Sequence, residues 1–133
     1  MTYALDTNIL SYMLKSNPTV VKKFLEVSNN GHNCVIPPVA YYEIKRGLIA
    51  VNATAKEKAF DKLCNAFGVG QMTLSSWLKA ANIYAINRNN GQMIEDVDLF
   101  IAAFCLAHGY TLVTANTKHF EIIDGLAVVD WTV

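Results

Sequence analysis

The chain has 133 residues, which suits one domain with a single core, and we expect residues 1–133 to form that domain. Hydrophobic residues make up 53% and charged residues 17%, which excludes a disordered chain, and a net charge of zero argues against a protein that grips long nucleic acid by charge alone. No apolar stretch approaches the ~18 residues of a membrane span and the N-terminus has no export pattern, so we expect a soluble cytoplasmic protein.

The first half of the chain predicts two short strands and four helices. Apolar segments at 2–6 and 34–36 have the length of buried strands. Asn17 and Pro18 give the clearest helix start, an N-cap followed by proline at the first helical position. The four helices are predicted, in chain order, at 8–15, from Pro18 to a stop at 29–31, at 39–50 and at 55–67.

The second half predicts a weak strand at 71–74 and then a long helix that is capped by Ser75 or Ser76 and reaches about Arg88. Asp96 can cap a helix over 97–108, which is apolar on nearly every side and is therefore expected to be buried. Two further strands are predicted at 111–114 and 126–129. Short strands that alternate with helices imply right-handed crossovers, and so a three-layer α/β/α sandwich with a mainly parallel sheet of four or five strands.

The three cysteines are Cys34, Cys64 and Cys105. Each lies in an apolar stretch, and no short spacing pairs them. Because no zinc-ligand spacing is present, we expect a structural role as small buried hydrophobes.

Acidic and amide residues follow the predicted strands or begin the helices after them. Asp6 follows the first strand, Glu43 lies in the helix after the second, Asp98 begins the buried helix and Asn116 follows the strand 111–114. In a doubly wound sheet such positions share one edge, so we expect these residues to converge. Each also has an ordinary alternative as a helix-stabilising, solvated or turn residue.

A divalent cation would explain the position of Asp98. Its helix is strongly apolar, and no Lys or Arg occurs between Arg88 and Lys118 to pair with it. Carboxylate and amide oxygens with no histidine or thiolate nearby suit Mg²⁺ or Mn²⁺ over zinc. The corresponding chemistry is phosphodiester hydrolysis with a metal-activated water.

Four segments then follow in the order of a known family, with two further pairs that close the chain as in many members. They are Leu5-Asp6-Thr7-Asn8, Tyr42-Glu43-Ile44 through Gly47, Asp96-Val97-Asp98-Leu99-Phe100-Ile101-Ala102-Ala103, Val113-Thr114-Ala115-Asn116-Thr117-Lys118-His119-Phe120, Gly125-Leu126 and Asp130-Trp131. Over nearly all of its length the chain resembles the PIN-domain ribonucleases of the VapC toxin type. This resemblance implies a Mg²⁺- or Mn²⁺-dependent endoribonuclease that cuts RNA, chiefly transfer RNA, and halts translation. It also implies a VapB-like antitoxin that blocks the active site, and a homodimer.

By position, Asp6, Glu43 and Asp98 match the family's three metal-binding acids. Asn116 stands where many relatives carry a fourth acid, and we take it as a catalytic residue. Asparagine can coordinate through its carbonyl oxygen but has no charge, so the resemblance leaves one or two metal ions open. Asp96 is close enough to be confused with Asp98, which is preferred because it directly precedes the Leu-Phe-Ile-Ala-Ala run.

The resemblance also suggests residues that contact RNA, water or metal. Thr7 and Thr114 match positions that often help to hold water or metal. The candidate RNA contacts are the basic residues that flank the motif segments, namely Lys45, Arg46, Arg88 and Lys118, each with the alternative of a solvated surface charge. Pro37-Pro38 stand where many relatives have serine or threonine, so proline is expected to set the start of the glutamate helix.

Two alternatives of other classes are open. A catalytically dead PIN-like binding module has no reason to retain Asp6, Glu43 and Asp98 together. A receiver-like or dehalogenase-like phosphotransfer domain also has an Asp after its first strand. The dehalogenase pattern needs a second Asp where Asn8 stands, and a receiver needs an acid where the second strand ends in prolines.

Overall fold

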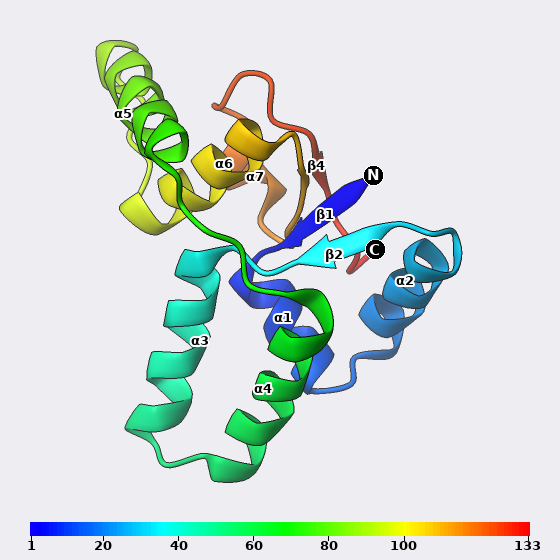
Figure 1. Ribbon diagram of the computed structural model, residues 1–133. Helices are drawn as coiled ribbons and strands as arrows, with labels where there is room; N and C mark the ends of the chain where they lie inside the picture. Colours follow the sequence, from blue (N-terminus) through cyan, green and yellow to red (C-terminus); the bar gives the residue numbers. More distant parts are fainter.

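The computed structural model describes residues 1–133 and contains a four-stranded sheet in which all neighbouring strands are parallel (Figure 1). The strands are, in chain order, β1 (Thr2–Leu5), β2 (Asn33–Val35), β3 (Thr111–Val113) and β4 (Val128–Val129). Their order across the sheet is β2-β1-β3-β4, so Ala4 of β1 lies between Val35 and Leu112. The carboxyl ends of parallel strands share one edge, and the segments after β1 and β3 therefore start side by side.

Seven helices surround the sheet. They are α1 (Thr7–Leu14), α2 (Pro18–Asn29), α3 (Pro38–Ala50), α4 (Thr54–Phe67), α5 (Leu74–Asn89), α6 (Asp96–His108) and α7 (Thr117–Phe120). Figure 1 shows α1, α3 and α4 together on one side of the sheet, and α5, α6 and α7 on the other. The predicted α/β sandwich with a mainly parallel sheet is confirmed, with four strands. No helix of the chain combines the length and apolar character that crossing a membrane requires.

Helix α6 lies at the centre of the hydrophobic core, as its all-round apolar sequence predicts. Leu99 and every residue from 101 to 105 are buried, and the helix packs against α5, α3 and β3. Burial of each large apolar side chain stabilises the fold by roughly 1.5–3 kcal/mol. The first turn of α6 is therefore held firmly at the edge of the sheet where β1 ends.

The three cysteines are free thiols, with Cys105 buried and the other two half-buried. Burial raises the pKa of Cys34 to about 11 and of Cys105 to about 12, so both stay protonated at neutral pH. This agrees with the structural role expected from the sequence.

The strand predicted at 71–74 is wrong. Ile36 and Val69 form only an isolated bridge, in which Gly70 donates its N–H to the carbonyl of Ile36. Gly70 lies so close to the ring of Phe104 that a Cβ atom there would clash with it. Thr73 then starts helix α5, so the chain leaves the sheet before a strand can extend.

The predicted caps of two helices are also wrong. Helix α5 is capped by Thr73, which forms a capping box with Ser76 at the third helical position. Ser76 therefore takes part in the cap without being the N-cap, and Ser75 is not part of it. Helix α6 begins at Asp96, with Glu95 as an N-cap residue that makes no side-chain cap bond. The short helix α7 was not predicted.

Candidate active site

Asp6 ends β1 and is the N-cap of α1, at the edge of the sheet predicted for it. Its side chain is buried, and its Oδ1 atom accepts a hydrogen bond from the backbone N–H of Thr7 at 2.7 Å. Its Oδ2 atom accepts from the hydroxyl of Thr114 at 2.7 Å and from the amide of Asn8 at 3.4 Å. Burial raises the pKa of Asp6, and the charge of Glu43 raises it further, while the three hydrogen bonds oppose these effects.

Glu43 is joined to Asp6 through Thr7. The hydroxyl of Thr7 donates to Oε1 of Glu43 at 2.7 Å, and Thr7 is also the backbone donor to Asp6. Helix α3 positions Glu43 and starts at Pro38, with no side-chain cap, as expected from the paired prolines. Arg46 lies one turn further along, with its Nη2 atom 3.9 Å from Oε2 of Glu43.

Asp98 enters the site from the first turn of α6. Burial raises the pKa of Asp98, and the negative charge of Asp6 raises it further, so the two carboxylates are close enough to repel each other. Asp96 lies elsewhere, lining a groove between α5 and α6 with Trp77 and Phe100. Of the two acids in this turn, Asp98 is the one whose pKa the charge of Asp6 raises, and the preference for Asp98 as a site residue stays a prediction.

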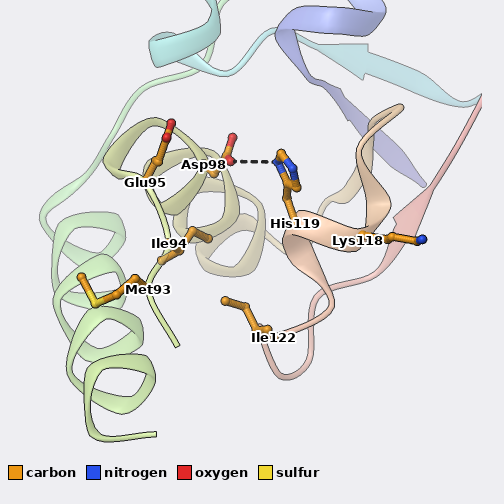
Figure 2. A pocket seen from close by; sticks show the side chains of 7 residues that line it. All are labelled: Met93, Ile94, Glu95, Asp98, Lys118, His119 and Ile122. Carbon is orange, nitrogen blue, oxygen red and sulfur yellow. Dashed lines mark ion pairs between the residues drawn. The ribbon is translucent and has the colours of Figure 1, made fainter. Parts of the chain in front are cut away.

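His119 is a residue that sequence reasoning missed. Its Nδ1 atom lies 3.5 Å from Oδ2 of Asp98, and a dashed line marks this contact in Figure 2. The expectation that no histidine lies near the acids is therefore wrong. His119 reaches Asp98 because α7 turns the chain back toward α6 directly after β3. The signal was its place three residues after Asn116, in a segment already assigned to this edge.

Thr114 and Asn8 form the polar floor of the site. Thr114 is fully buried, and its hydroxyl accepts from the backbone N–H of Asn116 at 3.0 Å while donating to Asp6. The side chain of Asn8 accepts from the N–H of Ala115 at 3.1 Å and so ties the start of α1 to the end of β3. The sequence pattern does not predict this role of Asn8. Asn116 itself is exposed at the N-cap of α7, and its side chain makes no hydrogen bond to the protein.

The four basic candidates lie in different environments. The ammonium of Lys45 contacts Asp61 at 2.6 Å and Glu57 at 2.8 Å, and these partners raise the pKa of Lys45. Its charge is thus used to join α3 to α4. Arg46 lies over the ring of Tyr42. Arg88 is exposed in the last turn of α5 and forms no ion pair, and Lys118 is exposed on α7.

Two cavities flank the carboxylates. One of about 390 Å³ adjoins Asp98, and its lining residues are Met93, Ile94, Glu95, Asp98, Lys118, His119 and Ile122 (Figure 2). The other, of about 280 Å³, adjoins Thr7 and Glu43 between α1 and α3 and includes Leu14, Ile44 and Leu48. The three acids therefore lie between two hollows of the surface.

The donor chemistry fits a hard divalent cation, although no group of three His, Cys, Asp or Glu side chains is arranged to hold a metal ion directly. Asp6 is buried without a Lys or Arg partner, and its charge raises the pKa of Asp98. Such a partly buried cluster of negative charge is relieved by a cation or by protons. Carboxylate oxygens with hydroxyl and amide oxygens beside them suit Mg²⁺ or Mn²⁺.

Comparison with known proteins identifies the family of this chain. The model of the PIN domain matches residues 3–126 of this chain. Ribonuclease VapC1 of Haemophilus influenzae (strain R2866) is 28% identical over 99% of each chain, and the tRNA(fMet)-specific endonuclease VapC of Shigella flexneri is 26% identical over 99% of each. The solved structure of VapBC-1 from nontypeable Haemophilus influenzae has a TM-score of 0.89 and 27% identity, covering 100% of both chains. These similarities extend over the segments that carry Asp6, Glu43 and Asp98.

Proposed function

Because this chain belongs to the PIN domain family, we propose that it is a VapC-type toxin, an endoribonuclease that hydrolyses phosphodiester bonds of RNA. The observation that carries the proposal is the convergence of three acids, which lie directly after β1, in the second turn of α3 and in the first turn of α6. Relatives named as ribonucleases over their whole length support the same activity. We also propose that residues 1–133 act as one domain.

A divalent cation, Mg²⁺ or Mn²⁺, is the proposed cofactor, held by Asp6, Glu43 and Asp98. When bound, such an ion activates a water molecule as nucleophile and stabilises the leaving oxygen. The rest of the site serves to keep these carboxylates in place. Thr114 and Asn8 fix the Oδ2 atom of Asp6, and Thr7 fixes Glu43 relative to Asp6.

Asn116 is the proposed fourth catalytic residue. Its backbone is tied to the site through Thr114, and its side chain is free at the rim. An amide there can accept or donate a hydrogen bond to the RNA or to water without adding negative charge. This favours a site that repels the phosphate less than four acids would.

Transfer RNA is the proposed substrate, supported by the relative whose name gives it this target. Arg46 lies beside Glu43 and Lys118 lines the cavity that adjoins Asp98, and we propose that they bind phosphates on either side of the cut. Arg88 would contact RNA further from the cut. Lys45 is the weakest of the four candidates, because its charge is already paired with Glu57 and Asp61.

A VapB-like antitoxin is the proposed partner, supported by VapBC complexes of the same fold. The cavity beside Glu43 has an apolar wall of Leu14, Ile44 and Leu48, with Lys15 and Lys56 at its edge. An amphipathic segment with acidic residues would fit there and cover Glu43. The location of such a complex would be the cytoplasm.

The proposal is tested with Asp6→Asn, which removes one negative charge but keeps the side chain's size. Purified wild-type protein with Mg²⁺ or Mn²⁺ is expected to cleave RNA, and Asp6→Asn to lower the rate at least 100-fold with an unchanged circular dichroism spectrum. Asp124→Asn, in an exposed loop, is the matched control and should cleave as the wild type does. Expression of the wild type, but not of Asp6→Asn, should arrest growth.

Equal cleavage by the wild type and Asp6→Asn would indicate a contaminating nuclease and contradict the proposal. RNA binding without any cleavage would favour the alternative of a catalytically dead binding module. The retained set of three acids argues against that alternative.

A further inference from the structure

The cavity beside Asp98 differs from the polar surroundings of Asp6, because apolar side chains form part of its lining. We call it the α6–α7 pocket, and it is defined by Met93, Ile94, Glu95, Asp98, Lys118, His119 and Ile122. Its volume of about 390 Å³ lies within the range of small-molecule sites and can hold one nucleobase. It opens directly next to a carboxylate of the proposed active site.

The walls of this pocket suit a flat, partly apolar group. Figure 2 shows Ile94 and Ile122 directed toward its centre from opposite elements, and Met93 on the same side as Ile94. The ring of His119 lies on the α7 side, near Asp98, and its side chain is 61% exposed. An exposed ring opposite apolar side chains forms a slot in which a planar base can stack.

The charges of the pocket exclude a phosphate as its occupant. Glu95 and Asp98 both line it, and their carboxylates would repel an anion. In Figure 2 the ammonium of Lys118 points away from Asp98, and Lys118 is exposed. A phosphate would therefore bind outside the pocket near Lys118, while the occupant of the pocket is uncharged.

We propose that the α6–α7 pocket binds the base of an unpaired nucleotide next to the scissile phosphate, which stacks on His119 and packs against Ile94 and Ile122. This inference rests on the proposed ribonuclease function and adds how the substrate is held. Such a pocket admits only a base that is turned out of a helix, so it selects single-stranded or loop RNA. His119 acts in it as a specificity-determining residue.

The experiment measures equilibrium binding of a short labelled RNA to the full-length protein in EDTA, by fluorescence anisotropy, after the cleavage position has been mapped with the metal present. The RNA carries either an intact base or an abasic site at the nucleotide flanking the cut on each side. The variants are His119→Ala and His119→Phe, which keeps an aromatic ring. His32→Ala is the matched control, because His32 precedes β2, an outer strand of the sheet, and packs edge-on against the ring of Tyr3.

Loss of the stacked base is expected to weaken wild-type binding on the order of tenfold. His119→Ala should weaken binding of the intact RNA to a similar extent, and the abasic site should then cause little further loss. His119→Phe should retain affinity within about threefold, since stacking needs only a ring. His32→Ala should bind as the wild type does.

Three results would overturn the inference. In the first, the abasic sites leave the wild-type affinity unchanged. In the second, His119→Ala and the abasic site together weaken binding by the product of their separate fold-losses. In the third, His119→Phe loses as much affinity as His119→Ala, which would mean that His119 acts through Asp98. In each of these cases a wild-type protein that still cleaves RNA would leave the proposed function intact. A wild type that neither binds nor cleaves RNA would refute both.

Discussion

The carboxylates of Asp6 and Asp98 are held in the folded protein in conditions that disfavour their charge. Burial raises the pKa of both, and for Asp98 the charge of Asp6 is the next cause. The two carboxylates that the proposed site needs therefore lower the stability of the folded protein, because the apolar core around α6 does not compensate their negative charge. A bound cation would remove this conflict.

We therefore predict that Asp98→Asn stabilises the metal-free protein at neutral pH. A raised pKa means that the folded state binds the proton more tightly than the unfolded state, so the free energy of unfolding falls as the pH rises through the unfolded and then the folded pKa. Replacing the carboxylate by an amide removes this loss, and the thermal midpoint in EDTA at pH 7 should rise. The gain should disappear below the ordinary aspartate pKa of about 3.9.

Thermal unfolding followed by circular dichroism checks this, with Asp124→Asn as a control that should leave the midpoint unchanged. A lower midpoint for Asp98→Asn at pH 7 in EDTA would mean that the Asp98 carboxylate makes a favourable interaction, with His119 as the candidate partner at 3.5 Å. The account of a charge-strained site would then be wrong.

At the residue level the three acids were predictable and their neighbours were not. Asp6, Glu43 and Asp98 lie directly after a strand or near the start of a helix, and the sequence pattern predicts such positions directly. His119 and Asn8 depend on where the four-residue helix α7 turns and on side-chain hydrogen bonds between α1 and the end of β3. Neither leaves a periodic pattern. The ion pairs of Lys45 with Glu57 and Asp61 of α4 leave no periodic pattern either, because these partners are 12 and 16 positions away in the sequence.

Among the elements, helix α5 has two different faces. The residues that it buries against α6 are Ser76, Ala80, Ile83 and Asn87, of which two are polar. Its outer face carries large exposed apolar side chains, with Trp77 46% and Leu78 62% exposed, and Tyr84 beside them. Trp77 packs edge-on against Phe100 of α6 and lines a groove of about 330 Å³. Exposed apolar patches of this kind mark protein interfaces.

The homodimer implied by the family resemblance is therefore predicted to form through this α5–α6 face. Trp77→Glu places a charge at the centre of the face and should shift the protein from dimer to monomer, at least tenfold in the dissociation constant. Light scattering after size exclusion measures the mass. Val51→Glu, at an exposed apolar position after α3, is the control and should stay dimeric.

A wild type that is monomeric at high concentration would contradict the dimer itself. A dimer that survives Trp77→Glu would place its interface on another face of the molecule.

The element boundaries show where sequence patterns suffice. Every predicted helix exists, because helix stops and apolar periodicity indicate it even where the predicted cap residue is wrong, and the four clear strands pair as the alternation requires. The strand at 71–74 failed because its segment is set by Gly70 against Phe104 and by the cap at Thr73. The contact of Gly70 with Phe104 joins residues far apart in the sequence, so local composition could not reveal it, whereas the cap at Thr73 is a local interaction with Ser76.

In the molecule as a whole, acids from three separate segments lie at the carboxyl edge of the sheet, where we propose one metal-dependent hydrolytic site. The topology β2-β1-β3-β4 brings Asp6 and the segment after β3 together, and α3 and α6 bring the other two acids. The core around α6 fixes this edge, while the apolar faces of α5 and of the cavity beside Glu43 remain for partners.

The most direct test is the rate of transfer RNA cleavage by the wild-type protein as Mg²⁺ is titrated from zero in a chelated buffer. We expect no cleavage in EDTA, a rate that rises with Mg²⁺ to saturation, and recovery of activity when Mn²⁺ is added to the stripped protein. Cleavage at the same rate in EDTA as in saturating Mg²⁺ would contradict this expectation.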